Sequence, residues 1–227
     1  MTYEIIMRQF QIYQITPPEF VLLAGSDPPL YRHHLTLGPF ECEFFAVPHS
    51  IPQTRSLVVR VNGAKVLFMS DFKLTDCFAY PGLTQKLEGF LATQAPFDFV
   101  AYEALYRERE GMSPSEDTVR EPLRQVFAQT PWCLIGTWFA SNLIRYLLVE
   151  QECQLAGFRL GTLGRTMREF VSIGLQRGLL EAPRKPEERG RSRWMTASTG
   201  HQGEGMSSDD PTEMAALVKA AKQIPSE

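Results

Sequence analysis

The stretch SLVVRVNGAKVLFM, which spans residues 56–69, decides the fold of the first half of the chain. Two runs of β-branched and other apolar residues flank Asn62-Gly63, the dipeptide that tight β-hairpin turns prefer. We therefore predict a hairpin with one strand on each side of that turn. A further strand alternates around Cys42, so we expect residues 35–73 to hold three strands.

Two polar side chains follow strand-like runs in this region. His49 comes after the run 42–47, and Asp71 comes after the run 65–69. Side chains at the ends of strands face the crevice where layered α/β folds place their chemistry. A histidine nitrogen and a carboxylate oxygen both suit zinc, but one His and one Asp do not define a metal site, because zinc takes about four ligands.

The middle of the chain mixes helix and strand signals. Apolar residues recur with helical spacing over residues 83–94, and residues 97–102 read as a buried strand that ends at Glu103. Residues 113–116 read SPSE, which predicts a helix start with Ser113 as the N-cap, proline at the first helical position and glutamate three residues after the cap.

Strands and helices alternate from residue 132 onward. The predicted elements are strand 132–137, a helix from Ser141 or Asn142 to residue 155, strand 158–163, helix 166–176 and strand 194–198. Strands that alternate with helices of this length predict a parallel sheet with crossover helices.

Composition sets limits on the class of protein. The chain has 227 residues, of which 44% are hydrophobic, and this predicts a folded globule. Its net charge of −3 gives no global nucleic-acid signature, so RNA binding would need local positive patches. The N-terminus lacks the pattern of a signal peptide, and no apolar stretch approaches the ~18 residues that cross a bilayer. We expect a cytoplasmic protein with no membrane partner.

The four cysteines show neither a Cys-x-x-Cys pair nor zinc-finger spacing. Cys42, Cys133 and Cys153 lie in apolar surroundings, and we expect them to be buried. Cys77 follows Asp76 in a turn-like segment, and we expect it to be more exposed.

Short motifs distributed along the chain carry a family resemblance. They are LTLGPFECEFF (35–45), HSIP (49–52), SDFK (70–73), GMSPSE (111–116), FASN (139–142), LGRTM (163–167) and TGHQGE (199–204). In this order and at these spacings they resemble the RNase J family, which comprises metallo-β-lactamase-fold ribonucleases with a β-CASP insertion. The resemblance runs from about Leu35 to Glu204, most of the chain.

The resemblance implies an α/β fold in three parts. A partial metallo-β-lactamase-like domain would cover residues 1–108, a β-CASP-like parallel α/β domain would cover 109–204, and a polar tail would cover 205–227. It also implies zinc as cofactor, RNA as partner and hydrolysis of RNA phosphodiester bonds as the ancestral reaction.

The same resemblance implies roles for individual residues. His49 would be a ligand to one zinc ion, and Asp71 would be the carboxylate that bridges two. Glu103 would be the candidate catalytic carboxylate, which orients a metal-bound histidine. Alternatives stay open: His49 as a hydrogen-bonded cleft residue, Asp71 as the cap of the following turn, and Glu103 as an exposed residue at a strand end. Lys73 would pair with Asp71 or phosphate, although a solvated lysine is the more ordinary interpretation.

Two further segments carry candidate substrate-binding residues. Ser141 and Asn142 lie at a predicted helix start, where free backbone N–H groups favour anions, although ordinary N-capping explains them equally well. Thr199, Gly200 and Gln202 lie in a glycine-rich loop after a strand, a geometry that suits a backbone phosphate.

Several of the family's motifs have no counterpart in this sequence. His33, His34, His49 and His201 do not form the family's His-x-His-x-Asp-His cluster, and neither Ser-Gly-His nor Pro-Val-His-Gly-Glu follows the Gln-Gly-Glu segment. We therefore expect a truncated or degenerate RNase J-like protein that is inactive alone. The alternatives are a non-catalytic RNA-binding or scaffold module, half of a split ribonuclease completed by another chain, and a remnant with no selected function. A complementing chain or a homo-oligomer is the expected protein partner.

Overall fold

The computed structural model describes residues 6–7, 10–11, 13–19, 32–104, 108, 110–130, 133–180 and 193–198. These residues fall into two compact units, which are treated separately below. One unit comprises residues 7–118, and the other comprises residues 1–6 and 119–227. The predicted boundary after residue 108 lies ten residues before this division, and the domain assignment stays a prediction. Within the described residues, no helix is both long enough and apolar enough to span a bilayer.

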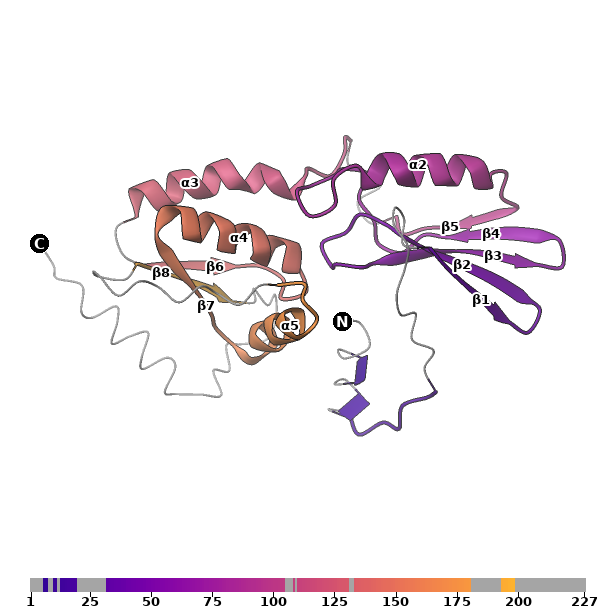
Figure 1. The fold of residues 1–227 in the computed structure, drawn as a ribbon, viewed down its shortest axis with the longest axis horizontal. Helices are drawn as coiled ribbons and strands as arrows, with labels where there is room; N and C mark the ends of the chain where they lie inside the picture. Colours follow the sequence, from indigo (N-terminus) through magenta and orange to yellow (C-terminus); the bar gives the residue numbers. More distant parts are fainter. Residues whose placement is uncertain are drawn as a thin grey trace, which may run out of the picture. The chain divides into compact units, whose positions relative to one another are not determined.

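The first unit is built on a five-stranded sheet in the order β1-β2-β3-β4-β5 (Figure 1). The strands are β1 (His33–Leu37), β2 (Phe40–Ala46), β3 (Arg55–Val61), β4 (Ala64–Phe68) and β5 (Phe99–Ala101). Neighbouring strands are antiparallel except β4 and β5, which are parallel.

The predicted hairpin is confirmed as β3 and β4. Asn62 and Gly63 connect them with φ values of 50° and 82°, and glycine and asparagine adopt such values more readily than other residues. The prediction of three strands over residues 35–73 is wrong in number, because β1 and β2 are separate strands. Gly38 turns the chain between them with a φ of 56°, so the region before His49 is itself a hairpin.

One face of this sheet packs against helix α2 (Leu83–Gln94), whose predicted bounds are confirmed. Phe45, Val58 and Leu67 of the sheet form a core with Leu83, Leu87 and Phe90 of the helix. The rings of Phe45 and Phe90 lie 4.8 Å apart. The segment over 97–102 is a strand but not a buried one, because β5 is the edge strand and Phe99 is 58% exposed.

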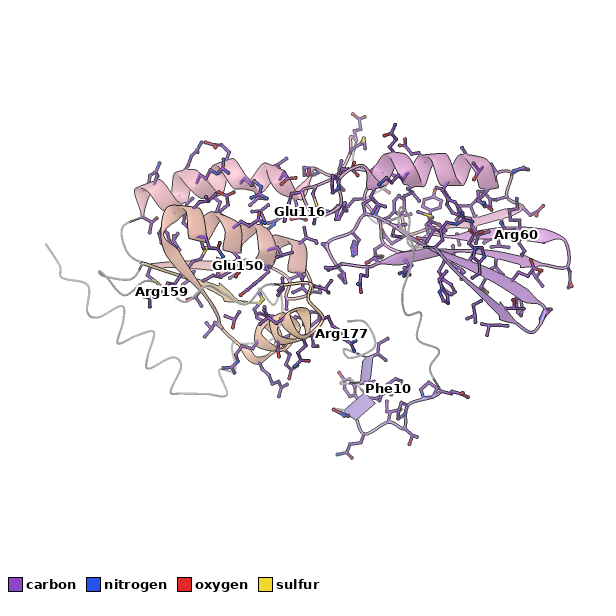
Figure 2. The ribbon with its side chains drawn as sticks, in the orientation of Figure 1. Phe10, Arg60, Glu116, Glu150, Arg159 and Arg177 are labelled. Atoms are coloured by element: carbon purple, nitrogen blue, oxygen red, sulfur yellow. The ribbon has the colours of Figure 1, made fainter. Side chains whose placement is uncertain are left out.

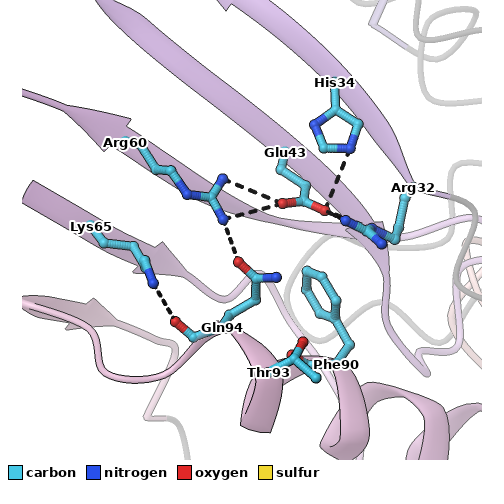
Figure 3. A network of polar contacts seen from close by, with 8 residues as sticks. All are labelled: Arg32, His34, Glu43, Arg60, Lys65, Phe90, Thr93 and Gln94. Atoms are coloured by element: carbon cyan, nitrogen blue, oxygen red, sulfur yellow. Dashed lines mark hydrogen bonds and ion pairs between the residues drawn. The ribbon is translucent and has the colours of Figure 1, made fainter. Parts of the chain in front are cut away.

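A charged network extends the same face beyond the apolar core (Figure 3). The Glu43 side chain on β2 is 2% exposed and accepts a hydrogen bond of 2.6 Å from Arg32 Nε. Arg60 on β3 lies 3.3 Å from Glu43 and also donates to the Gln94 side chain at the end of α2. His34 lies 3.6 Å from the same carboxylate. A buried carboxylate needs such partners, and here they tie β1, β2 and β3 to the helix.

The second unit holds a three-stranded parallel sheet in the order β6-β8-β7. Its elements are the 3₁₀ turn η1 (Glu116–Val119), which begins in the first unit, α3 (Arg120–Gln129), β6 (Cys133–Thr137), α4 (Leu143–Ala156), β7 (Phe158–Thr162), α5 (Arg165–Gln176) and β8 (Arg193–Ser198). The predicted alternation of parallel strands and crossover helices is confirmed, and with it the α/β class of the whole fold.

Two details differ from the sequence-based expectations. The helix predicted to begin after Ser113 begins later, and Ser115 caps the turn by accepting a hydrogen bond from the Asp117 N–H. Cys77 is buried and Cys133 is exposed, the reverse of the expectation, whereas Cys42 and Cys153 are buried as expected. Cys133 begins the edge strand β6, and an apolar sequence neighbourhood does not show which strand lies at an edge.

Candidate functional site

His49 and Asp71 lie side by side in the structure. His49 Nε2 is 3.9 Å from Asp71 Oδ2. The two residues follow β2 and β4, which run in the same direction because each is antiparallel to β3. Their loops therefore emerge at one edge of the sheet, as the sequence predicts.

Backbone and hydroxyl contacts fix these two loops. The Lys73 N–H donates to the Pro48 carbonyl at 2.7 Å, which joins the loop of Asp71 to that of His49. The Ser70 N–H donates to the buried Ser56 Oγ at 3.1 Å. The Met69 N–H donates to the Ala101 carbonyl at 2.8 Å. Asp71 is thus anchored to the sheet from both sides.

A buried ion pair lies beside the two residues. Lys73 Nζ is 2.8 Å from Glu116 Oε1, and the Glu116 side chain is only 2% exposed. Figure 2 labels Glu116 just before α3. Lys73 is partly buried and pairs with Glu116 and not with Asp71, so the expectation of a solvated lysine is wrong, and a contact with phosphate stays a prediction. Glu116 was predicted only as a capping glutamate. Its place in the SPSE motif could have drawn attention to it, but the motif does not reveal its burial.

The surroundings of His49 favour the neutral imidazole. Burial lowers the pKa of His49 and outweighs the nearby Asp71, which acts to raise it; Lys73 lowers it and Glu116 raises it. A neutral imidazole is the form that binds a metal ion. The Asp71 side chain is 67% exposed, so its carboxylate is accessible from solvent.

The donor set is too small for zinc. Across the described ranges no three His, Cys, Asp or Glu residues are grouped so that they could hold a metal ion. His49 and Asp71 provide two donors of the right chemistry, whereas a zinc site takes about four. Glu103 follows β5, which is parallel to β4, so it emerges at the same edge of the sheet, and it is exposed. We therefore assign no catalytic step through zinc to these residues alone.

The candidate substrate-binding residues belong to the other unit. Asn142 is the N-cap of α4, and its Oδ1 accepts a hydrogen bond of 2.8 Å from the Arg145 N–H. This is the capping role that the sequence left open. The Ser141 carbonyl accepts from the Leu143 N–H at 2.9 Å. Thr199, Gly200, Gln202 and His201 lie outside the described residues.

Curated relatives support the family resemblance. Over 83% of its length the chain is 31% identical to ribonuclease J of Sinorhizobium meliloti. Over 91% of its length it is 27% identical to ribonuclease J of Mycobacterium tuberculosis. The chain is a relative of ribonuclease J. This RNase J-like chain spans about a third of the length of the curated relatives it matches, 33% and 37% for these two. No family model matches it.

A solved structure supports the fold. A crystal structure of a protein of unknown function from Enterococcus faecalis V583 superposes with a TM-score of 0.58 at 11% identity. The match covers 91% of the RNase J-like chain and 54% of that structure. A mixed sheet followed by a parallel sheet is consistent with a partial metallo-β-lactamase fold with a β-CASP-like part.

Proposed function

We propose that this RNase J-like chain derives from a zinc-dependent ribonuclease and does not hydrolyse RNA by itself. One observation supports this most directly: His49 and Asp71, the two residues matched to the family's metal ligands, lie 3.9 Å apart at one edge of the sheet. The chain thus keeps part of a ligand set. Paired metal ions in a complete set would activate a water molecule and neutralise the phosphate.

Zinc content and RNA turnover test this proposal together. The purified full chain is dialysed against metal-free buffer, its zinc is measured, and its activity on single-stranded RNA is assayed with added zinc. We expect weak zinc binding that His49→Ala and Asp71→Ala reduce, and no turnover. The matched control is His34→Ala, which changes a 66% exposed histidine on β1 and leaves zinc binding unchanged. Two tightly retained zinc ions per chain, or RNA turnover that Asp71→Ala abolishes, would contradict the proposal.

A second candidate function is half of a split ribonuclease. The exposed carboxylate of Asp71 favours it, because a donor at the surface is accessible to ligands from another chain. If this is correct, a complementing chain that carries the His-x-His-x-Asp-His motif restores both zinc retention and RNA cleavage, and Asp71→Ala abolishes both. RNA binding that persists unchanged in His49→Ala and Asp71→Ala would instead favour a non-catalytic RNA-binding module.

A cytoplasmic location forms part of the proposal. It is supported by the four cysteines, all of which are free thiols. Proteins of oxidising compartments more often pair their cysteines. Detection of the native chain in the soluble cell fraction, with its thiols reduced, tests this point.

A further inference from the structure

Residues 115–117 make consecutive polar contacts with the loop that follows Asp71. The side chain of each of these residues takes part, and the partners are spread along residues 73–78. The contacts are Ser115 Oγ donating to the Asp76 carbonyl at 2.6 Å, Lys73 Nζ donating to Glu116 Oε1 at 2.8 Å and the Phe78 N–H donating to Asp117 Oδ2 at 2.8 Å. Residues 73–78 form neither helix nor strand, so these contacts satisfy polar groups that regular secondary structure would otherwise satisfy.

Lys73 is the residue through which these contacts reach both candidate metal ligands. It lies two residues after Asp71, and its N–H donates to the Pro48 carbonyl in the peptide unit that leads into His49. Its Nζ is bound by Glu116. One lysine thus joins the two loops, and Glu116 fixes the position of that lysine.

Burial makes this ion pair hard to separate. The Glu116 side chain is 2% exposed, and the Lys73 side chain is 22% exposed. If Lys73 moved away, a buried carboxylate would lose a charged partner, and an uncompensated buried charge is strongly unfavourable. We infer that Glu116 is a positioning residue, which acts through Lys73 to hold the two candidate metal ligands 3.9 Å apart.

The inference rests on the proposed function only in that His49 and Asp71 are the residues matched to the family's metal ligands. It requires no bound metal ion, because the contacts join side chains and loops of the chain itself. It also gives Glu116 a role at the site, whereas the sequence predicted only a capping glutamate at this position.

The chemical reactivity of His49 measures its placement. Its side chain is 18% exposed, against 66% for His34. Diethyl pyrocarbonate acylates neutral imidazoles, and at about pH 8 histidines are neutral, since their ordinary pKa is about 6.5, so the rate reports accessibility and not charge. Peptide mass spectrometry of the purified full chain gives the rate at His49. Glu116→Gln should raise this rate roughly threefold to fourfold, the ratio of the 66% and 18% exposed fractions.

Three further variants separate positioning from general destabilisation, and urea unfolding shows that each is folded in the assay. Lys73→Met removes the ammonium group and keeps the backbone N–H, and it should raise the rate as Glu116→Gln does. Lys73→Arg keeps a cation that can pair with Glu116, so it should retain the wild-type rate. Glu43→Gln is the matched control, because the Glu43 side chain is also 2% exposed and its partner Arg60 lies near the end of β3 opposite the site. It should leave the rate unchanged.

A measurement on the wild type tests the inference even if a variant does not fold. The Lys73 N–H should exchange with deuterium much more slowly than an exposed amide, because it is bonded to the Pro48 carbonyl. Exchange as fast as that of an exposed amide would overturn the inference. So would an unchanged rate at His49 in Glu116→Gln and Lys73→Met, or an equal increase in Glu43→Gln. Two tightly retained zinc ions, or RNA turnover, would contradict the proposed function without changing these acylation rates.

Discussion

At the residue scale, a single carboxylate of the first unit satisfies several backbone N–H groups. The residue is Asp76. Its Oδ2 accepts from the Gly82 N–H at 2.6 Å, and its Oδ1 accepts from the Thr84 N–H at 2.8 Å. Burial would raise the pKa of Asp76, but the hydrogen bonds from Thr84, Gly82 and Leu83 outweigh it and lower the pKa. Asp76 therefore satisfies the free N–H groups at the start of α2 in place of a residue at the cap itself.

Replacing Asp76 tests this capping role. Asp76→Ala should lower the free energy of unfolding by about 1–2 kcal/mol, the usual cost of losing a helix cap. Urea denaturation followed by circular dichroism measures the change. Asp98→Ala is the control for a carboxylate that bonds a single backbone N–H, that of Lys65, and it should cost less. Equal losses for the two variants would refute the capping role.

His49 should make stability depend on pH. Its pKa is below the ordinary 6.5 in the folded chain, chiefly because of burial. Below about pH 6.5 the unfolded chain therefore binds a proton on His49 more readily than the folded chain does. The free energy of unfolding should fall as the pH drops from 6.5 through the lowered pKa, and this decline should flatten in His49→Gln. Urea titrations over that pH range measure it. Gln85→Ala, an exposed change on α2, should keep the wild-type dependence. An unchanged slope in His49→Gln would contradict this account.

At the element scale, α3 and α4 are joined by a buried carboxylate. Glu152 Oε1 lies 2.7 Å from Arg120 and Glu152 Oε2 lies 2.6 Å from Arg124, while the Glu152 side chain is fully buried. The hydrogen bond from Arg124 lowers the pKa of Glu152 and, with that from Arg120, outweighs burial. These pairs join α3 to α4 through a single carboxylate.

Removing the charge should loosen this helix pair. Glu152→Gln should lower the free energy of unfolding by about 1–3 kcal/mol. This loss is smaller than that for breaking a fully buried ion pair, because both arginines are partly exposed and solvent screens their charges. The stabilisation by Glu152 is present above its ordinary pKa and should be lost as the pH falls through the lowered pKa. Chemical denaturation at neutral and acid pH measures both effects. The nearby Gln151→Ala, which removes an exposed contact to Arg120, is the control. If the free energy of unfolding of Glu152→Gln depends on pH as that of the wild type does, the stabilising role of the Glu152 charge is refuted.

The elements also show what a single sequence can predict. The Asn62-Gly63 dipeptide alone predicted the β3–β4 hairpin, and the helical spacing of apolar residues predicted both ends of α2 correctly. Strand β1 was missed, although Gly38-Pro39 is a turn signal, because its five residues contain only two apolar ones, Leu35 and Leu37. For the site, the positions of His49 and Asp71 after strand-like runs predicted that each faces a crevice, and the structure places the two side chains 3.9 Å apart. The Lys73–Glu116 pair joins residues 43 positions apart, and no local pattern reports such a contact.

At the scale of the whole molecule, the chain combines two compact units with different sheets. The first carries the candidate metal ligands on a mostly antiparallel sheet, and the second is built on a parallel sheet. Function was harder to predict than fold, because chemistry requires a complete set of ligands, whereas a fold requires only consistent patterns of apolar residues.

The distribution of the four thiols gives the molecule a native attachment point. Cys42, Cys77 and Cys153 are at most 8% exposed, and burial raises the pKa of the Cys153 thiol to about 12. Cys133 alone among the four is exposed. A maleimide dye should therefore couple to one site in the folded chain and to all four in denaturant, as mass spectrometry of the conjugates would show. Cys133→Ser should abolish the native coupling. A fluorescent reporter on the second unit is thus available without adding a cysteine.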